Sequence, residues 1–220
     1  MAEVRAFVVS AGATPSGVAT ARLPDWPEAI VVAADGGLAA AYVLERGINA
    51  VIGDFDSVDN DLLERARREG VAVQAHAVDK DATDLDLAIE YAVLQGATEV
   101  CVIDSMRGRV DHFIAAALLL ASDRWWRVGV QATIDDARLF VVPPGETVSF
   151  ASDLGSTVSL IPLGDVPFVT TTGLQYRLQG EPLVAGGTGG VSNVAIDDVV
   201  TVRSAGGNCA LLVLQPGAET

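Results

Sequence analysis

One stretch decides the fold of this chain: Ala50-Val51-Ile52-Gly53-Asp54-Phe55-Asp56-Ser57. The first three residues form a short apolar run typical of a buried strand, and Gly53 allows the backbone to turn sharply after it. Asp54 and Asp56 follow at the position where an α/β sheet presents ligand groups, beyond the carboxyl end of a strand. Since residues i and i+2 of an extended chain point the same way, we expect both carboxylates to face one Mg²⁺ ion.

Short apolar runs alternate with helical patterns on either side of this stretch, as far as Pro143. The expected strands are 6–10, 30–34, 50–52, 71–75, 100–103, 128–134 and 139–142. The expected helices are 38–46, 61–69, 85–95 and 110–121. Alternation of this kind favours an α/β fold with a mostly parallel sheet covered by helices. The last of these helices is apolar on nearly every face, so we expect it to be well buried.

The pattern changes at Pro143-Pro144-Gly145, which can continue neither a helix nor a central strand and therefore indicates a domain boundary. We expect an α/β domain over 1–143 and an all-β domain over 144–220. In the second domain the expected strands are 147–150, 157–161, 168–172, 191–196, 199–203 and 210–214. Their short, regular spacing is typical of a small antiparallel sandwich or barrel. The structure of the glycine-rich segment 177–190 is left open.

The composition argues against several classes of protein. With 220 residues, 50% of them apolar, the chain can bury a full core in one or two domains. Its 29 acidic and 14 basic residues give a net charge of −15, which disfavours nonspecific binding to nucleic acid or to an anionic membrane. Cys101 and Cys209 both lie inside apolar runs, so we expect them to be buried free thiols in a reducing cytosol. We find no signal-peptide pattern, and the densest apolar helical run, 113–121, is too short to span a bilayer, so we expect a soluble cytoplasmic protein.

Two further acidic groups follow expected strands: Asp35-Gly36-Gly37 and Asp79-Lys80-Asp81-Ala82-Thr83-Asp84. The first could cap the next helix, or its backbone N–H groups could approach a nucleotide. In the second, Thr83 followed by Asp86 resembles a capping box, but the aspartates outnumber what capping requires. Lys80 could meet a phosphate or neutralise its neighbours. We favour a functional interpretation of the second group.

A basic residue enters with the next group, Arg109-Val110-Asp111-His112. Arg109 offers a rigid fork for phosphate oxygens, and Asp111 could orient that arginine or reach a metal. His112 opens an apolar helix, where a histidine is more often structural than catalytic. The chain has no phosphate-binding loop of the Gly-x-x-x-x-Gly-Lys type, no nucleophile elbow and no convincing zinc site. The motifs therefore favour a Mg²⁺ ion that is held by carboxylates and that binds the phosphates of a ligand.

These motifs, in this order, resemble the thiamine pyrophosphokinase (thiamin diphosphokinase) family. The matching pieces are Ala34-Asp35-Gly36-Gly37, Gly53-Asp54-Phe55-Asp56-Ser57, Asp79 to Asp84, Gly108 to His112, Thr172-Gly173-Leu174-Gln175-Tyr176-Arg177-Leu178 and Ser192-Asn193. The resemblance implies a three-layer α/β/α domain, a C-terminal β-sandwich and a homodimer with active sites at the dimer interface. It also implies transfer of the pyrophosphoryl group of ATP to the hydroxyethyl oxygen of thiamine, which leaves AMP.

The resemblance implies overlapping sets of site residues. Mg²⁺ would be held by Asp54, Asp56, Asp81 and Asp84. Catalysis would depend on Asp54, Asp56, Asp84, Asp111 and Arg109, with Asp84 or Asp111 accepting the hydroxyl proton. ATP would be contacted by Asp35, Gly36, Gly37, Lys80, Thr83, Arg109 and His112. Thiamine would be held by Tyr176, Ser192 and Asn193, with the Tyr176 ring stacking on its heterocycle.

One segment departs from the family pattern. A glycine-rich approach usually precedes the arginine, whereas this chain has Asp104-Ser105-Met106-Arg107-Gly108, which retains one glycine. The backbone of such a loop is more restricted than that of a multi-glycine loop. Two alternatives stay open: a pyrophosphokinase for another hydroxymethyl heterocycle, such as a pterin, and a non-catalytic sensor of thiamine or nucleotide.

Overall fold

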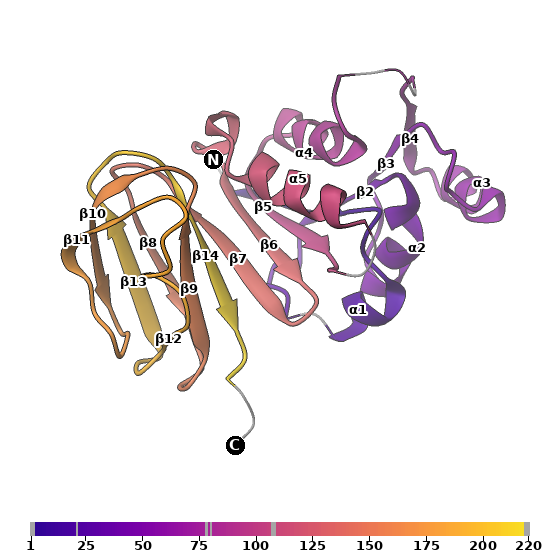
Figure 1. Ribbon diagram of the computed structural model, residues 1–220. Helices are drawn as coiled ribbons and strands as arrows, with labels where there is room; N and C mark the ends of the chain where they lie inside the picture. Colours follow the sequence, from indigo (N-terminus) through magenta and orange to yellow (C-terminus); the bar gives the residue numbers. More distant parts are fainter. Residues whose placement is uncertain (1–2, 21, 78, 80, 107–108, 218–220) are drawn as a thin grey trace. The chain divides into compact units, whose positions relative to one another are not determined.

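The computed structural model describes residues 3–20, 22–77, 79, 81–106 and 109–217, and the chain forms two compact units, 1–136 and 137–220 (Figure 1). The strands of the first unit are β1 (Val4–Val9), β2 (Ile30–Ala34), β3 (Ala50–Gly53), β4 (Ala72–Ala75), β5 (Ala97–Asp104) and β6 (Gly129–Ile134). They lie in the order β6-β5-β1-β2-β3-β4, and each of these pairings is parallel. The expectation of a mostly parallel sheet is therefore confirmed.

Helices cover both faces of this sheet (Figure 1). They are α1 (Pro15–Thr20), α2 (Leu38–Ala41), α3 (Asn60–Arg68), α4 (Asp84–Leu94) and α5 (Val110–Leu120), with short 3-10 turns η1 (Asp35–Gly37), η2 (Tyr42–Leu44) and η3 (Asp123–Trp125). Alternate residues of the strands point to opposite faces, so Phe7 and Val9 of β1 join a core with Leu38 of α2 and Leu63 of α3. On the other face α4 buries Ile89. The three-layer α/β/α arrangement is confirmed.

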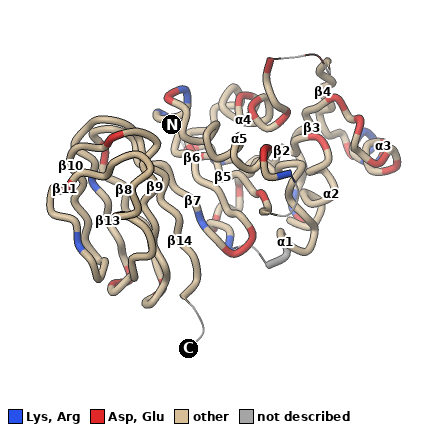
Figure 2. The backbone as a smooth tube through the Cα atoms, in the orientation of Figure 1, with Lys and Arg blue, Asp and Glu red and all other residues tan. Residues whose placement is uncertain are grey.

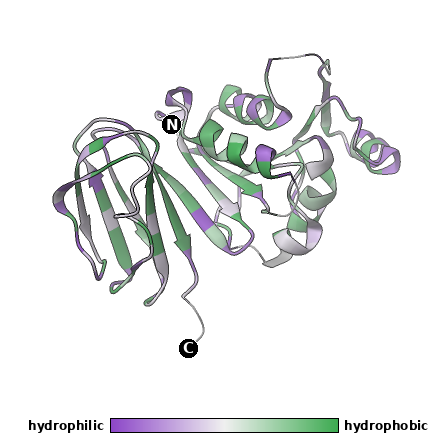
Figure 3. Cartoon of the chain, in the orientation of Figure 1, coloured by the Kyte–Doolittle hydropathy of each residue, from purple (hydrophilic) through white to green (hydrophobic). Residues whose placement is uncertain are grey.

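Two expectations about helices are wrong. The helix expected over 38–46 is only four residues of α-helix, because the chain tightens into η2 and then reverses at Glu45, whose φ is +52°. The apolar helix α5 was expected to be well buried, yet Leu120 is the one buried residue among its described positions, and Leu118 is 52% exposed. Figure 3 shows hydrophobic colour along most of α5. An all-apolar pattern predicts that a helix avoids water, but it does not identify what covers it.

The second unit is an antiparallel sandwich, as expected. Its strands are β7 (Ala137–Val142), β8 (Thr147–Ala151), β9 (Thr157–Pro162), β10 (Val166–Thr172), β11 (Gln179–Leu183), β12 (Asn193–Val194), β13 (Val199–Ser204) and β14 (Ala210–Gln215). One sheet has the order β12-β9-β14-β7 and the other β11-β10-β13-β8. Phe140, Phe150, Leu160 and Leu212 are among the residues of the core of this unit.

Three details of this unit differ from the sequence analysis. Strand β7, placed before the expected boundary at 143, belongs to the second unit because it pairs with β14. Strand β11 lies in the segment whose structure was left open. The strand expected over 191–196 is reduced to the two residues of β12. In the described part of the chain, none of the helices has the length and apolar character that a membrane span requires.

Candidate metal and phosphate site

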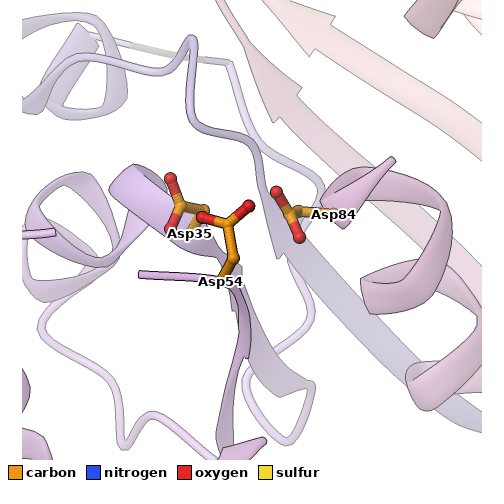
Figure 4. A group of neighbouring side chains, drawn as sticks. All are labelled: Asp35, Asp54 and Asp84. Atoms are coloured by element: carbon orange, nitrogen blue, oxygen red, sulfur yellow. The ribbon is translucent and has the colours of Figure 1, made fainter. Parts of the chain in front are cut away.

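Three carboxylates meet at the carboxyl edge of the parallel sheet (Figure 4). Asp35 follows β2, Asp54 follows β3 and Asp84 begins α4, and one oxygen of each lies within 4.8 Å of the other two. Strands β2 and β3 are neighbours in parallel register, with Ala34 opposite Ile52, so the residues that follow them emerge side by side. We call Asp35, Asp54 and Asp84 the carboxylate group.

Asp35 is the buried member of the group, with 5% of its surface exposed. Its Oδ1 accepts a hydrogen bond from the Phe55 amide at 3.1 Å, and its Oδ2 accepts one from the Ser57 hydroxyl. Asp35 makes no side-chain cap for the helix that follows, so the capping interpretation of this aspartate is wrong. Ser57 was not among the expected site residues, although it ends the stretch that carries Asp54. Both carboxylate oxygens of Asp35 are thus fixed in place.

The glycines after Asp35 pack closely. A Cβ on Gly37 would lie 2.3 Å from the carbonyl oxygen of Val9, so this position requires glycine for the approach of η1 to β1. Gly36 has more space, because a Cβ there would meet the Ser57 hydroxyl at 3.3 Å. The packing explains Gly37 without a ligand, and it leaves contact with ATP a prediction for both glycines.

Asp54 and Asp56 do not share the extended geometry that the sequence suggested. Strand β3 ends at Gly53, and Phe55 has a φ of +63°, so the side chains at 54 and 56 no longer point the same way. The Asp54 carboxylate accepts a hydrogen bond from the Asp56 amide at 3.2 Å. The charge of Asp54, followed by desolvation and the charge of Asp35, raises the pKa of Asp56. Asp56 therefore lies in the field of the carboxylate group without being one of its three members.

The start of α4 combines capping with the carboxylate group. Thr83 is the N-cap, and its hydroxyl accepts a hydrogen bond from the Asp86 amide at 3.2 Å. Arg124 donates to both oxygens of Asp86 at 3.0 and 2.9 Å, so Asp86 is engaged by an arginine. The helix carries acidic residues and no basic ones (Figure 2). Asp84 lies at its positive end, where a carboxylate is favoured.

The other residues of this segment lie outside the group. Asp79 and Asp81 are exposed, and neither is one of the three close carboxylates. Lys80 lies outside the described residues, as do Arg107 and Gly108. Their expected contacts with metal or phosphate stay predictions.

Arg109 and Asp111 form a forked ion pair before and within the first turn of α5. The Arg109 Nε and Nη2 atoms donate to the two Asp111 oxygens at 3.2 and 2.6 Å. This contact lowers the pKa of Asp111 to about 2. Arg109, Asp111 and His112 are all exposed. This ion pair fits the interpretation that Asp111 orients Arg109, and contact of Arg109 with phosphate stays a prediction.

The expected thiamine residues lie together in the second unit. Asn193 accepts from the Tyr176 amide at 3.0 Å and donates to the Tyr176 carbonyl at 2.6 Å. Its Oδ1 also accepts from the Val194 amide at 2.9 Å. Ser192 has a φ of +61°, and its amide donates to the Ser159 hydroxyl. The Tyr176 side chain is 66% exposed. The side chain of Asn193 is therefore used to hold the backbone of Tyr176.

The carboxylate group suits a divalent cation. Three carboxylates this close repel one another unless a positive charge lies among them, and Mg²⁺ prefers hard oxygen ligands of this kind. The cation would in turn attract phosphate oxygens. The donor set therefore fits Mg²⁺ bound with a phosphate ester or anhydride.

Comparisons with known proteins point to one family. The model described as "Thiamin pyrophosphokinase, catalytic domain" matches residues 25–128, and "Thiamin pyrophosphokinase, vitamin B1 binding domain" matches residues 146–209. Thiamine pyrophosphokinase of Bacillus subtilis is 29% identical over 157 residues, which cover 70% of this chain and 73% of that protein. Thiamine pyrophosphokinase 1 of Arabidopsis thaliana is 30% identical over 166 residues, or 71% of this chain, and the match spans only 61% of the plant protein.

Solved structures share the fold. The crystal structure of thiamine pyrophosphokinase from Bacillus subtilis superimposes with a TM-score of 0.80 at 22% identity, covering 98% of this chain and 100% of that one. Thiamin pyrophosphokinase from Candida albicans gives a TM-score of 0.78 at 14% identity, covering 97% and 89%. At these identities the similarity concerns the fold.

Proposed function

The chain belongs to the thiamin pyrophosphokinase family, and we propose that it transfers the pyrophosphoryl group of ATP to the hydroxyethyl oxygen of thiamine and releases AMP. The observation that carries the proposal is the carboxylate group of Asp35, Asp54 and Asp84, which lies within the stretch matched by the catalytic-domain model. Transfer of phosphoryl-type groups depends mainly on positioning and on neutralisation of charge. A cluster of carboxylates at a sheet edge supplies both once a cation joins it.

Asp35, Asp54 and Asp84 would hold Mg²⁺, with Asp56 and Asp81 as further acidic contacts. When bound, the metal would orient the phosphates and withdraw the negative charge that builds up on them during transfer. Asp35 is suited to this role because the Ser57 hydroxyl and the Phe55 amide fix its two oxygens. The burial of Asp35 also keeps its carboxylate from turning away into solvent.

Arg109 would contact the phosphates from the start of α5, with His112, Thr83, Lys80 and the Asp35-Gly36-Gly37 backbone completing the ATP contacts. A guanidinium fork suits phosphate oxygens. Asp111 has a pKa of about 2 and is already paired with Arg109, so it is better suited to orienting Arg109 than to accepting a proton. We assign acceptance of the thiamine hydroxyl proton to Asp84.

In the second unit, Tyr176 would stack its exposed ring on the thiamine heterocycle. Asn193 would act through Tyr176, since its amide group holds the Tyr176 backbone on both sides. Ser192 would offer its hydroxyl to the substrate. The match of residues 146–209 to a vitamin B1 binding domain supports this assignment.

We also propose that the protein is a homodimer. The exposed face of α5 carries Val110, Ile114 and Leu118, which are 69, 52 and 52% exposed, and a second copy of the chain would cover it (Figure 3). Sedimentation equilibrium should give twice the mass of one chain, and Leu118→Asp should give monomers. Leu154→Asp, which puts the same change on an exposed leucine of the second unit, should leave the dimer intact. A monomeric wild type contradicts this part of the proposal.

The reaction is tested with purified protein, thiamine, ATP and MgCl₂, with products resolved by mass. We expect thiamine diphosphate and AMP in equal amounts. AMP without thiamine diphosphate would point to hydrolysis or to another acceptor, which a hydroxymethylpterin would then probe. Binding of thiamine without turnover would overturn the enzymatic proposal in favour of a sensor.

A further inference from the structure

Two carboxylates tie together three loops at the carboxyl edge of the parallel sheet. Asp104, the last residue of β5, accepts hydrogen bonds from the Ser10 hydroxyl at 2.5 Å and from the Ser105 amide at 2.8 Å. Asp135, which follows β6, accepts from the Ser105 hydroxyl at 2.8 Å and from the Met106 amide at 3.1 Å. Asp104 thus joins the loop after β5 to the loop after β1, and Asp135 joins it to the loop after β6. We call these contacts the edge network.

The edge network is closely packed. Ser10 and Ser105 are both buried, and the Gly12 amide donates to the Ser10 hydroxyl at 3.1 Å. A Cβ on Gly12 would lie 2.3 Å from the Asp104 Oδ1 atom, so an alanine there would displace the Asp104 carboxylate. Asp135 has a φ of +52°, an uncommon backbone conformation that its two hydrogen bonds help to hold.

The position of the edge network suggests a role in the reaction. Strands β1 and β5 are neighbours, but the chain continues from β1 to β2 on one side and from β5 to β6 on the other. Open α/β sheets bind ligands at such a switch point, outside the carboxyl ends of the strands. Strand β1 also borders β2, which leads to Asp35 of the carboxylate group. Burial raises the pKa of Asp104, and the hydrogen bonds from Ser10 and Ser105 and the charge of His112 in α5 oppose this rise.

We infer that Asp104 and Asp135 are positioning residues for the pyrophosphoryl transfer, because they fix Ser105 and Met106, the described residues that precede Arg109 in the chain. This inference rests on the proposed function. The segment Asp104-Ser105-Met106 contains no glycine, and its donors are satisfied by two carboxylates, so its path is set before substrate binds. A preset path avoids the entropy of ordering the loop in each catalytic cycle, and small displacements of a charged group near phosphates cost rate.

The kinetic test compares Asp135→Ala, Ser105→Ala and the control Asp136→Ala. Asp136 is an exposed neighbour, so its substitution removes the same charge next to the edge network. Asp135→Ala should lower kcat at least tenfold while KM for thiamine stays within twofold of wild type. Ser105→Ala, which removes one hydroxyl donor, should lower kcat by less, and Asp136→Ala should behave as wild type. Urea unfolding is measured in parallel, to verify that each variant is folded under the conditions of the kinetic assay. A folded Asp135→Ala variant with wild-type kcat overturns the inference.

Nucleotide binding separates this inference from the proposed reaction. Calorimetry with Mg²⁺ and a non-hydrolysable ATP analogue should show at least tenfold weaker binding for Asp135→Ala. Gly12→Ala, whose Cβ would displace the Asp104 carboxylate, should weaken binding as well, and so should Asp104→Ala, which removes the contacts with the Ser10 hydroxyl and the Ser105 amide. If wild type makes no thiamine diphosphate, the proposed reaction is wrong, and binding of the ATP analogue alone tests whether Asp135 is a positioning residue. Weaker binding then supports that role, and equal binding in wild type and Asp135→Ala overturns it.

Discussion

Replacing Asp54 with asparagine tests the carboxylate group through both stability and catalysis. Without a cation the three carboxylates repel one another, and together they should bind Mg²⁺. One oxygen of each member lies within 4.8 Å of the others. At that separation two unit charges repel by about 3 kcal/mol at an effective dielectric constant of about 20, and by about 1 kcal/mol in bulk water. Asp54→Asn removes two of the three repulsive pairs. Without divalent cations, the variant should therefore be at least as stable as wild type.

Catalysis should change in the opposite direction. If Asp54 contacts the metal, the variant should lose at least about 100-fold in kcat/KM, or about 2.7 kcal/mol of transition-state stabilisation. The response of stability to Mg²⁺ should shrink as well. A ligand at 100 times its Kd stabilises the folded state by about 2.7 kcal/mol, and Asp54→Asn should lose most of this increment at the same Mg²⁺ concentration.

Urea unfolding with EDTA or with MgCl₂, combined with the product assay, measures all three quantities. Asp61→Asn on the exposed side of α3 is the control, because it removes one negative charge outside the carboxylate group. Two results would refute the reasoning: kinetics within tenfold of wild type, or a variant that is less stable than wild type in EDTA. The second would mean that Asp54 contributes structural contacts that outweigh the repulsion.

Three further predictions concern neighbouring contacts. Ser57→Ala removes a hydroxyl donor from Asp35, so kcat/KM should fall about tenfold, or about 1.4 kcal/mol, with KM for thiamine unchanged; an unaltered rate would separate Ser57 from the site. Arg109→Gln should raise the Asp111 pKa from about 2 toward 3.8, as followed by carboxyl carbon NMR shifts. Because the folded-state pKa of Asp111 is depressed, the wild-type ion pair adds stability above about pH 4 that is lost as the pH falls through about 2, and Arg109→Gln should lack this dependence. Thr83→Ala removes the N-cap of α4 and should cost about 1 kcal/mol in urea unfolding, and a midpoint equal to wild type would contradict the capping role.

The sequence predicted the sheet well because its central strands β1, β2, β3 and β5 are mostly buried. Runs such as Ala50-Val51-Ile52 are continuous and apolar, and they recur between helical patterns. This pattern is typical of buried parallel strands. The end of the helix after Asp35 was harder to predict. Nothing in its composition indicates that the chain forms the 3-10 turn η2 or that Glu45 takes a positive φ. The exposure of α5 could not be predicted from its own residues either, because burial depends on what packs against a helix.

The candidate site was only partly predictable for a related reason. Asp54 and Asp84 were recognised from local motifs, and they are two members of the carboxylate group. Asp35 was placed with the nucleotide, because its proximity to Asp54 depends on the pairing of β2 with β3, which is a long-range property. Ser57 belongs to the recognised stretch but was given no role, whereas Asp135 directly follows β6 and belongs to no motif. A polar residue directly after a strand is the signal that could have found Asp135.

Phe55 shows why the carboxylate group is better explained by function than by stability. A bulky residue at a φ of +63° is uncommon, and Asp35 beside it has a φ of +44°. The Phe55 amide donates to Asp35, so each unusual conformation is held in part by the other. The strain coincides with three carboxylates whose charges repel, and neither feature stabilises the isolated fold. Because Gly at position 55 would relieve the backbone strain and uncharged side chains would relieve the repulsion, their joint presence in one place argues that the site is arranged for a cation and the phosphates it binds.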